Sequence, residues 1–224
     1  MTRNYLLLTL LLALLGGAPA AQAQSKTDAD ATPRSDRPNY RGAGIGWESK
    51  TPPDTSCIRY SMFLIGDVGK PAPQSEGAEP SLNFMRRQIL AAGARSSTVY
   101  LGDNIYEYGL PPEGAGDRKE MERRMVDQLE VLRGYQGEKY MIPGNHDWKQ
   151  GLRGSVAQVN REQQFVEDYL RSDSSAFPYT GDFFLPRDAC PGPVEIKLQD
   201  DLVMIAVNSQ WFLQTNGERP AGGN

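Results

Sequence analysis

The sequence predicts an α/β fold in which parallel strands alternate with crossover helices. Short apolar runs alternate along the chain with longer stretches in which apolar residues recur at helical spacing. Three of the apolar runs end in the same way, with a glycine followed by Asp or Asn. A βαβαβα order of this kind is typical of parallel strands joined by helices that cover the faces of one sheet.

The first part of this pattern consists of two strands and the helix between them. Residues 58–65 are predicted to form the first strand and residues 98–101 the second. Residues 79–93 are predicted to be helical, because apolar residues recur on one face and Gly93 stands where a helix commonly ends. The residues expected on the buried face are Leu82, Met85, Ile89 and Leu90.

The second part continues the alternation and then changes to a hairpin. Helices are predicted over 117–133 and 155–171, with a third strand over 138–142 between them. Residues 194–198 and 202–207 flank a short polar turn and therefore predict a β-hairpin. The residues expected in the core from the two helices are Met121, Met125, Leu129, Leu132, Val159, Val166, Tyr169 and Leu170.

The amino-terminal stretch, residues 1–24, has the form of a secretory signal peptide. Arg3 supplies a positive charge, residues 6–15 are apolar, and Ala21-Gln22-Ala23 gives a small-x-small cleavage site. A membrane anchor is the alternative. The sequence thus predicts export to the bacterial periplasm, to the outer membrane or out of the cell, without a transmembrane helix in the mature chain. Residues 25–56 are polar and rich in Pro and Gly, which predicts a disordered linker.

Charge and cysteine content limit the possible partners and cross-links. The net charge of −4 and the pI near 5.2 do not favour nucleic acid or an anionic membrane as the main partner. Neither GxGxxG nor GxxxxGK[ST] follows a predicted strand, which argues against a nucleotide-binding protein. Cys57 and Cys190 are the only cysteines, so the exported chain has either one disulfide or two free thiols.

Polar motifs follow the three predicted strands, at 66–69 (GDVG), 102–106 (GDNIY) and 144–147 (GNHD). The carboxyl ends of neighbouring parallel strands meet at one edge of a sheet, where ligands commonly bind. The motifs supply carboxylate, phenol and amide oxygens, which suit divalent and trivalent metal ions. They also contain His146, the only histidine of the chain. The sequence therefore predicts a metal site at this edge.

The three motifs, in this order, resemble those of the calcineurin-like metallophosphoesterase superfamily. The pair GDxG and GDxxY is closest to its purple-acid-phosphatase branch. The longer segments LGDNIYEYGLP and IPGNHDW are similar to bacterial exported metallophosphoesterases, some of which are joined to an outer-membrane barrel. The resemblance covers about residues 58–211. It implies a β-sandwich flanked by helices, and hydrolysis of a phosphate ester by attack of hydroxide on phosphorus at a binuclear metal centre.

The same resemblance implies four metal ligands. Asp67 would bind the first metal ion, Asp103 would bridge both ions, and Tyr106 would complete the first site from the protein side. Asn145 would bind the second ion. Two divalent or trivalent ions are implied, with Fe, Zn and Mn all open. A tyrosine ligand is compatible with Fe(III) at the first site.

Three further residues would act on the substrate, or orient a residue that does, according to the resemblance. His146 would contact the phosphate and stabilise or protonate the leaving group, and Asp147 would hold the imidazole in the required tautomer. Asn104 would touch the phosphate as well.

The sequence departs from the family pattern after His146, because later histidine ligands, including a GHxH motif, are missing. We therefore expect residues 57–224 to represent an incomplete, amino-terminal part of the metallophosphoesterase domain. A missing carboxyl-terminal portion or a membrane barrel would be its further partner. The alternative is a non-catalytic exported module with an incomplete metal site, which binds a phosphorylated ligand or a partner chain.

Overall fold

The fold is known from a computed structural model, which describes residues 55–73, 79–178 and 182–214. All of them belong to the second of two compact units, Asp54–Asn224. The predicted signal peptide and almost all of the predicted linker lie outside the described residues. Within the linker range, Thr55 and Ser56 form a short 3-10 helix with Cys57 (η2, Thr55–Cys57).

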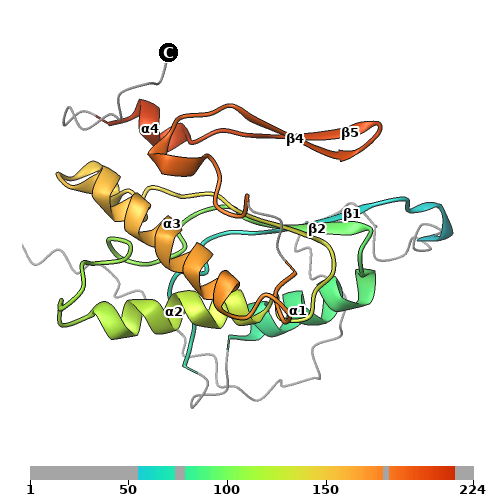
Figure 1. The fold of residues 1–224 in the computed structure, drawn as a ribbon, viewed down its shortest axis with the longest axis horizontal. Coiled ribbons are helices and arrows are strands. Elements are labelled where there is room, and N and C mark those ends of the chain that lie inside the picture. Colours follow the sequence, from blue (N-terminus) through green and yellow to red (C-terminus); the bar gives the residue numbers. More distant parts are fainter. Residues whose placement is uncertain (1–54, 74–78, 179–181, 215–224) are drawn as a thin grey trace, which may run out of the picture. The chain divides into compact units, whose positions relative to one another are not determined.

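A parallel sheet of three strands organises this unit (Figure 1). Its strands are β1 (Ser61–Ile65), β2 (Ser96–Tyr100) and β3 (Glu138–Met141), in the order β1-β2-β3. The register aligns the last residues of the strands, since Ile65 lies opposite Tyr100 and Tyr100 lies opposite Met141. The three loops that follow the strands therefore begin at the same edge of the sheet, and the predicted parallel α/β arrangement is confirmed.

Three long helices follow the strands in the predicted order. They are α1 (Pro80–Ala92), α2 (Arg118–Glu130) and α3 (Ser155–Ser172). The bounds of α1 follow from local chemistry, because the Glu79 carboxylate accepts a hydrogen bond from the Ser81 N–H and Gly93 adopts a left-handed φ of 68°.

The helices bury one face of the sheet. Side chains from this face, among them Tyr100 and Met141, form the main core with Ile89, Leu129 and Val166 of the helices. Most of the predicted core positions are buried, but Leu90 is 42% exposed, because the buried stripe of α1 runs through Leu82, Met85 and Ile89.

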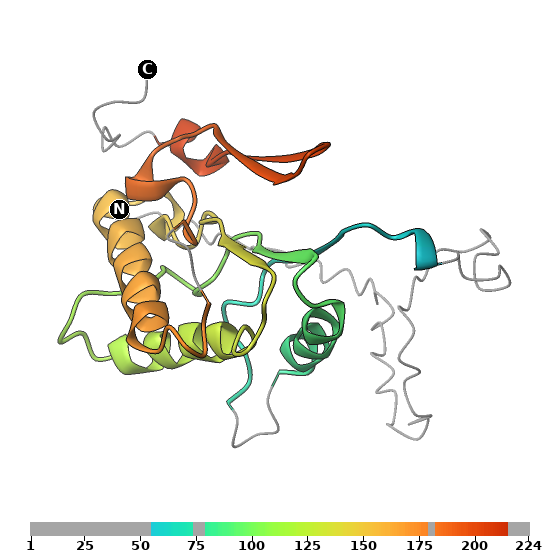
Figure 2. The same cartoon turned by 45° about the vertical axis from the view of Figure 1, so that its right-hand side comes forward.

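The β-hairpin covers the opposite face of the sheet (Figure 1, Figure 2). Its strands are β4 (Val194–Gln199) and β5 (Leu202–Ala206), as predicted. Leu198 and Ala206 pack in a second, smaller core. The residues that they join there are Val99, Tyr140 and Leu185. The described part of the chain thus has mixed α/β architecture, with helices, a parallel sheet and a hairpin in successive layers.

Three shorter helical elements complete the described residues: η4 (Lys149–Gly151), η5 (Arg187–Ala189) and α4 (Ser209–Phe212). The sequence did not predict α4, which has only four residues and follows the hairpin directly. No described helix is long and apolar enough to cross a membrane.

Both cysteines are free and exposed in this structure. The sequence left open either one disulfide or two free thiols, and the structure has two free thiols. The cores described above therefore form without a covalent cross-link between Cys57 and Cys190.

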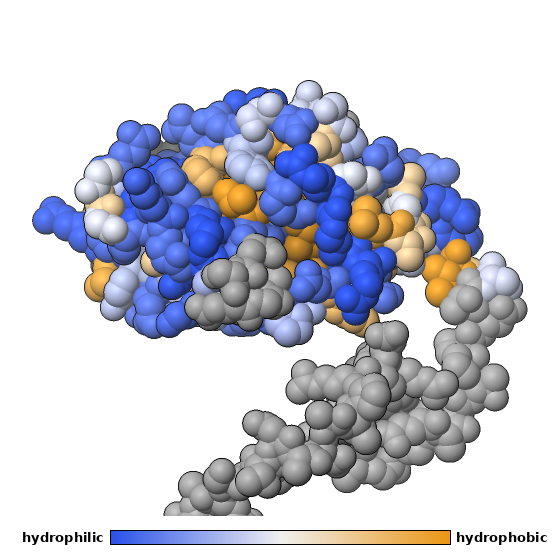
Figure 3. Space-filling model, turned by 90° about the horizontal axis from the view of Figure 1, so that it is seen from below, coloured by the Kyte–Doolittle hydropathy of each residue, from blue (hydrophilic) through white to orange (hydrophobic). Residues whose placement is uncertain are grey.

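The helix side of the molecule is mainly hydrophilic, with separate hydrophobic patches (Figure 3). Most charged residues of α2 form ion pairs along the helix, as in the pairs of Arg118 with Glu122 and of Arg124 with Glu120. Such pairs each contribute little to stability, but they keep this face soluble and hold several arginine side chains in fixed positions.

Candidate metal centre

The three motif loops meet because the pairing of the strands continues past their ends. The Leu101 N–H donates to the Ile65 carbonyl (2.7 Å), the Asp67 N–H to the Gly102 carbonyl (3.1 Å), and the Ile142 N–H to the Tyr100 carbonyl (2.8 Å). These main-chain hydrogen bonds place the loops that carry Asp67, Asp103 and His146 side by side at the carboxyl edge of the sheet.

Two glycines allow the loops to approach one another closely. A Cβ atom on Gly144 would overlap the main-chain N of Asp103, and a Cβ atom on Gly69 would overlap the Asp103 carbonyl oxygen. Asp67 and Asp103 themselves have φ values of 58° and 53°, in the left-handed region that Asp tolerates better than most residues. The motif pattern of Gly and Asp therefore reflects close packing of backbones around Asp103.

Three oxygen-bearing side chains converge at this point. The Tyr106 hydroxyl donates to Asp67 Oδ1 (2.8 Å) and lies 3.2 Å from Asp103 Oδ2, which competes for the same proton. Burial and the hydrogen bond to Asp67 raise the pKa of the phenol, and the Asp103 charge adds to this shift. Among the predicted ligands of the first metal site, Tyr106 thus lies within hydrogen-bonding distance of both carboxylates.

His146 lies against this oxygen cluster. Its main-chain N–H donates to Asp103 Oδ1 (3.1 Å), and its ring packs edge-on against Tyr106 with 4.4 Å between ring centroids. Nδ1 of the imidazole lies 2.6 Å from the Glu107 carbonyl oxygen and 3.3 Å from Gln150 Nε2, and the shorter contact is the one to the carbonyl. Because a carbonyl oxygen only accepts, this contact assigns a proton to Nδ1 and leaves Nε2 for other partners.

Asp147 does not have the role that the sequence predicted for it. Its buried carboxylate accepts hydrogen bonds from the main-chain N–H groups of Gly144 (2.7 Å), Ile105 (3.0 Å) and Asn104 (3.2 Å). It therefore ties the second and third motif loops together. The imidazole of His146 is instead oriented by the Glu107 carbonyl, a main-chain group that no sequence motif indicates.

Asn104 also differs from its predicted role of touching the phosphate. Its side chain is fully buried, and Nδ2 donates to the Ile142 carbonyl (3.0 Å) and to Asp147 Oδ2 (3.0 Å). These contacts make Asn104 a second link between the motif loops. Asn145, in contrast, is exposed, between Gly144 and His146, which both contact Asp103.

The donor set fits one hard cation better than it fits two. Asp67, Asp103 and Tyr106 offer carboxylate and phenol oxygens, which suit a hard divalent or trivalent ion. A second ion would have Asp103 and Asn145. The described residues contain no group of three or more His, Cys, Asp or Glu side chains placed to hold a metal ion. The two-metal site therefore remains a prediction.

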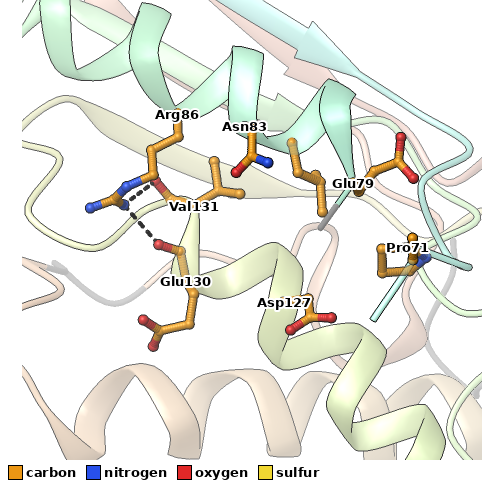
Figure 4. A pocket seen from close by; sticks show the side chains of 9 residues that line it. Pro71, Glu79, Asn83, Arg86, Asp127, Glu130 and Val131 are labelled. Atoms are coloured by element: carbon orange, nitrogen blue, oxygen red, sulfur yellow. Dashed lines mark hydrogen bonds between the residues drawn. The ribbon is translucent and has the colours of Figure 1, made fainter. Parts of the chain in front are cut away.

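A separate hollow lies between α1 and α2 (Figure 4). It has a volume of about 250 Å3, and Asn83, Arg86 and Asp127 are among its lining residues. Arg86 Nη1 donates to the Glu130 and Val131 carbonyls (2.8 and 2.9 Å) and so caps the end of α2. None of the predicted site residues lines this hollow, so it is not part of the candidate metal centre.

Comparison of the chain with protein-family models, with curated proteins and with solved structures gave no match. The motifs and the contacts among the three loops are therefore the observations that indicate a site here.

Glu162 of α3 lies beside Asp147, which joins the motif loops. Glu162 was not selected from the sequence, because it lies within an ordinary amphipathic helix pattern. It is fully buried, and its carboxyl group lies against the side chains of Asp147 and Asn104 and the main chain of Leu110. Burial and the neighbouring Asp147 carboxylate raise its pKa well above 4.5. Asp147 accepts three main-chain hydrogen bonds that favour its charged form, so we assign the proton of this pair to Glu162.

We expect Glu162→Gln to flatten the pH dependence of stability above pH 4.5. The folded chain retains a proton on Glu162 that the unfolded chain releases above pH 4.5, so the free energy of unfolding falls as pH rises. The slope from one such proton approaches about 1.4 kcal/mol per pH unit. Urea unfolding at several pH values measures it, with exposed Glu113→Gln as the control; an unchanged slope in Glu162→Gln would contradict the assignment.

Proposed function

We propose that this protein is an exported, metal-dependent hydrolase of phosphate esters with a binuclear metal centre. The observation that carries the proposal is the convergence of Asp67, Asp103 and Tyr106 oxygens at the carboxyl edge of the parallel sheet. The signal-peptide form of residues 1–24 supports export to the periplasm, to the outer membrane or out of the cell.

Some of the described residues would bind metal ions, and His146 would transfer a proton. Asp67, Asp103 and Tyr106 would hold the first ion, and Asp103 with Asn145 would contribute to the second. Bound metal ions would supply positive charge to a phosphate ester and lower the pKa of water. The Asp147 carboxylate keeps the loops that present these ligands together.

His146 would act on the leaving group through Nε2. The Glu107 carbonyl holds Nδ1–H, and edge-on packing against Tyr106 fixes the plane of the ring. In the neutral ring, Nε2 is an acceptor; once protonated, it donates a hydrogen bond or a proton to a departing oxygen. This arrangement supports the proposed role of His146 although the predicted partner, Asp147, is replaced by a carbonyl.

We further propose that the complete fold is a metallophosphoesterase-type β-sandwich flanked by helices. The hairpin covers β2 and β3, while Met62 and Leu64 of β1 and the nearby Leu101 remain exposed. An apolar strip beside a hairpin supports a sandwich in which further strands would cover this face.

A non-catalytic exported module that binds a phosphorylated ligand or a partner chain is the second candidate. It is favoured by the donor set, since among the described residues only Asp103 and Asn145 are proposed for a second ion, and His146 is the only histidine of the sequence. Such a module would bind phosphate without turnover.

Metal analysis and hydrolysis of p-nitrophenyl phosphate test the two candidates on the purified chain. For the hydrolase we expect about two bound metal ions per chain and turnover that is lost on EDTA treatment and restored by adding metal. Binding of phosphate without turnover in any of Fe, Zn or Mn would favour the second candidate. A chain that binds neither metal nor phosphate would contradict the hydrolase and the phosphate-binding module, and only a module that binds a partner chain would be left.

A further inference from the structure

The loop that carries Asp103 and Tyr106, which we call the ligand loop (residues 103–110), is held through its main-chain carbonyls. Side chains of α2 and α3 donate to every second carbonyl along it. The four contacts are Gln128 Nε2 to Asn104 (2.7 Å), Arg124 Nη1 to Tyr106 (2.8 Å), Gln158 Nε2 to Tyr108 (2.5 Å) and Arg161 Nε to Leu110 (3.3 Å). Because side chains rather than a neighbouring strand satisfy these carbonyls, the path of the loop depends on these helices.

Of the four donors, Arg124 is the one that contacts Tyr106, a proposed metal ligand. Its guanidinium binds the carbonyl of Tyr106, while the Tyr106 N–H donates to the Gly69 carbonyl (3.1 Å). Both main-chain groups of Tyr106 are therefore anchored, one to the first motif loop and one to α2. The Arg124 side chain is only 12% exposed, and Glu120 fixes its Nε at 2.9 Å. The donor that sets the position of Tyr106 is thus itself held in place.

We propose that Arg124 is a positioning residue for Tyr106, which it holds so that the phenol oxygen stays on the two carboxylates of Asp67 and Asp103. The inference rests on the proposed function, because the oxygen cluster is the proposed first metal site. Outer-shell residues that orient metal ligands commonly change metal affinity by about 10–100-fold when they are removed.

The preceding residue, Arg123, provides a matched control. It also lies on α2 and also pairs with Glu120, at 2.7 Å. Its remaining hydrogen bonds go to Asp127 and to the Pro71 carbonyl (3.3 Å), not to the ligand loop. Removing either arginine costs an ion pair with Glu120, but only the removal of Arg124 frees the Tyr106 carbonyl.

The test compares Arg124→Met, Arg124→Lys and Arg123→Met with the wild-type chain. Mn2+ affinity is measured by calorimetric titration, and hydrogen exchange of residues 103–110 is measured by mass spectrometry without metal. We expect Arg124→Met to bind Mn2+ about tenfold more weakly and to exchange faster in the ligand loop. Arg124→Lys should recover part of both, because its ammonium group still donates to a carbonyl, and Arg123→Met should behave like wild type.

The possible outcomes separate this inference from the proposed function. A wild-type chain that binds no Mn2+, Zn2+ or Fe3+ would overturn the proposed function, and the inference with it. If wild type binds and Arg124→Met binds equally well, or Arg123→Met is weakened to the same extent, the inference alone is overturned. If Arg124→Met does not fold, Arg124→Lys decides: affinity about threefold weaker than wild type supports the inference, and unchanged affinity overturns it.

Discussion

Asp103→Asn is expected to lower the turnover of p-nitrophenyl phosphate at least about a hundredfold, which corresponds to about 2.7 kcal/mol of transition-state stabilisation. Asp103 contacts both halves of the candidate centre, since one carboxylate oxygen lies at the Tyr106 hydroxyl and the other accepts the His146 N–H. An amide keeps the shape of the side chain but removes the charge that a bridging ligand would contribute to two cations. The steady-state rate with metal in excess measures the effect.

Asparagine is the informative substitution because of the backbone at this position. Asp103 has a φ of 53°, which Asn adopts readily and which is strained for Ala, so Asp103→Ala would combine lost charge with local distortion. Exposed Asp117→Asn, at the start of α2, is the control for a charge change elsewhere. Turnover of Asp103→Asn within a few-fold of wild type would exclude Asp103 from the reaction, while an equal loss in Asp117→Asn would indicate a non-specific effect.

The secondary-structure elements were predictable where the spacing of apolar residues within one element determines which face is buried. The three strands, the three long helices and the hairpin all occur in the predicted order, because patterns of apolar residues and Gly93 are local signals. The prediction that Leu90 is buried was wrong. Leu90 follows Ile89 by one residue and therefore lies about 100° further around the helix, on its exposed side. The four-residue helix α4 has too few residues to show a period.

The site was predictable in its positions and less so in its contacts. The parallel order implied that Asp67, Asp103 and the loop of His146 meet at one edge, and the register of the strands confirms this. The partner of the His146 ring is a main-chain carbonyl, which carries no sequence signal. The resemblance assigned Asp147 to the imidazole, whereas its carboxylate accepts hydrogen bonds from main-chain N–H groups of two turns. Which side chain accepts the hydrogen bonds of these N–H groups depends on the tertiary structure alone.

Removal of the Asp147 carboxylate is expected to cause the largest change in stability. Asp147→Ala should lower the free energy of unfolding by about 3–5 kcal/mol, because two buried main-chain N–H groups and one half-buried one would lose their acceptor. Asp147→Asn keeps one acceptor oxygen and should cost less than Asp147→Ala.

Urea unfolding at pH 8 is the appropriate measurement for these variants, because burial raises the pKa of Asp147 to about 6 and the carboxyl is then ionised in the folded chain. Asp168→Ala on the exposed side of α3 is the control and should change stability by no more than about 0.5 kcal/mol. A loss below about 1 kcal/mol in Asp147→Ala would mean that water replaces the carboxylate at the three N–H groups. The motif loops would then keep their positions without Asp147. A loss in the expected range, with metal affinity falling in parallel, would show that Asp147 supports the centre by joining two loops rather than by orienting His146.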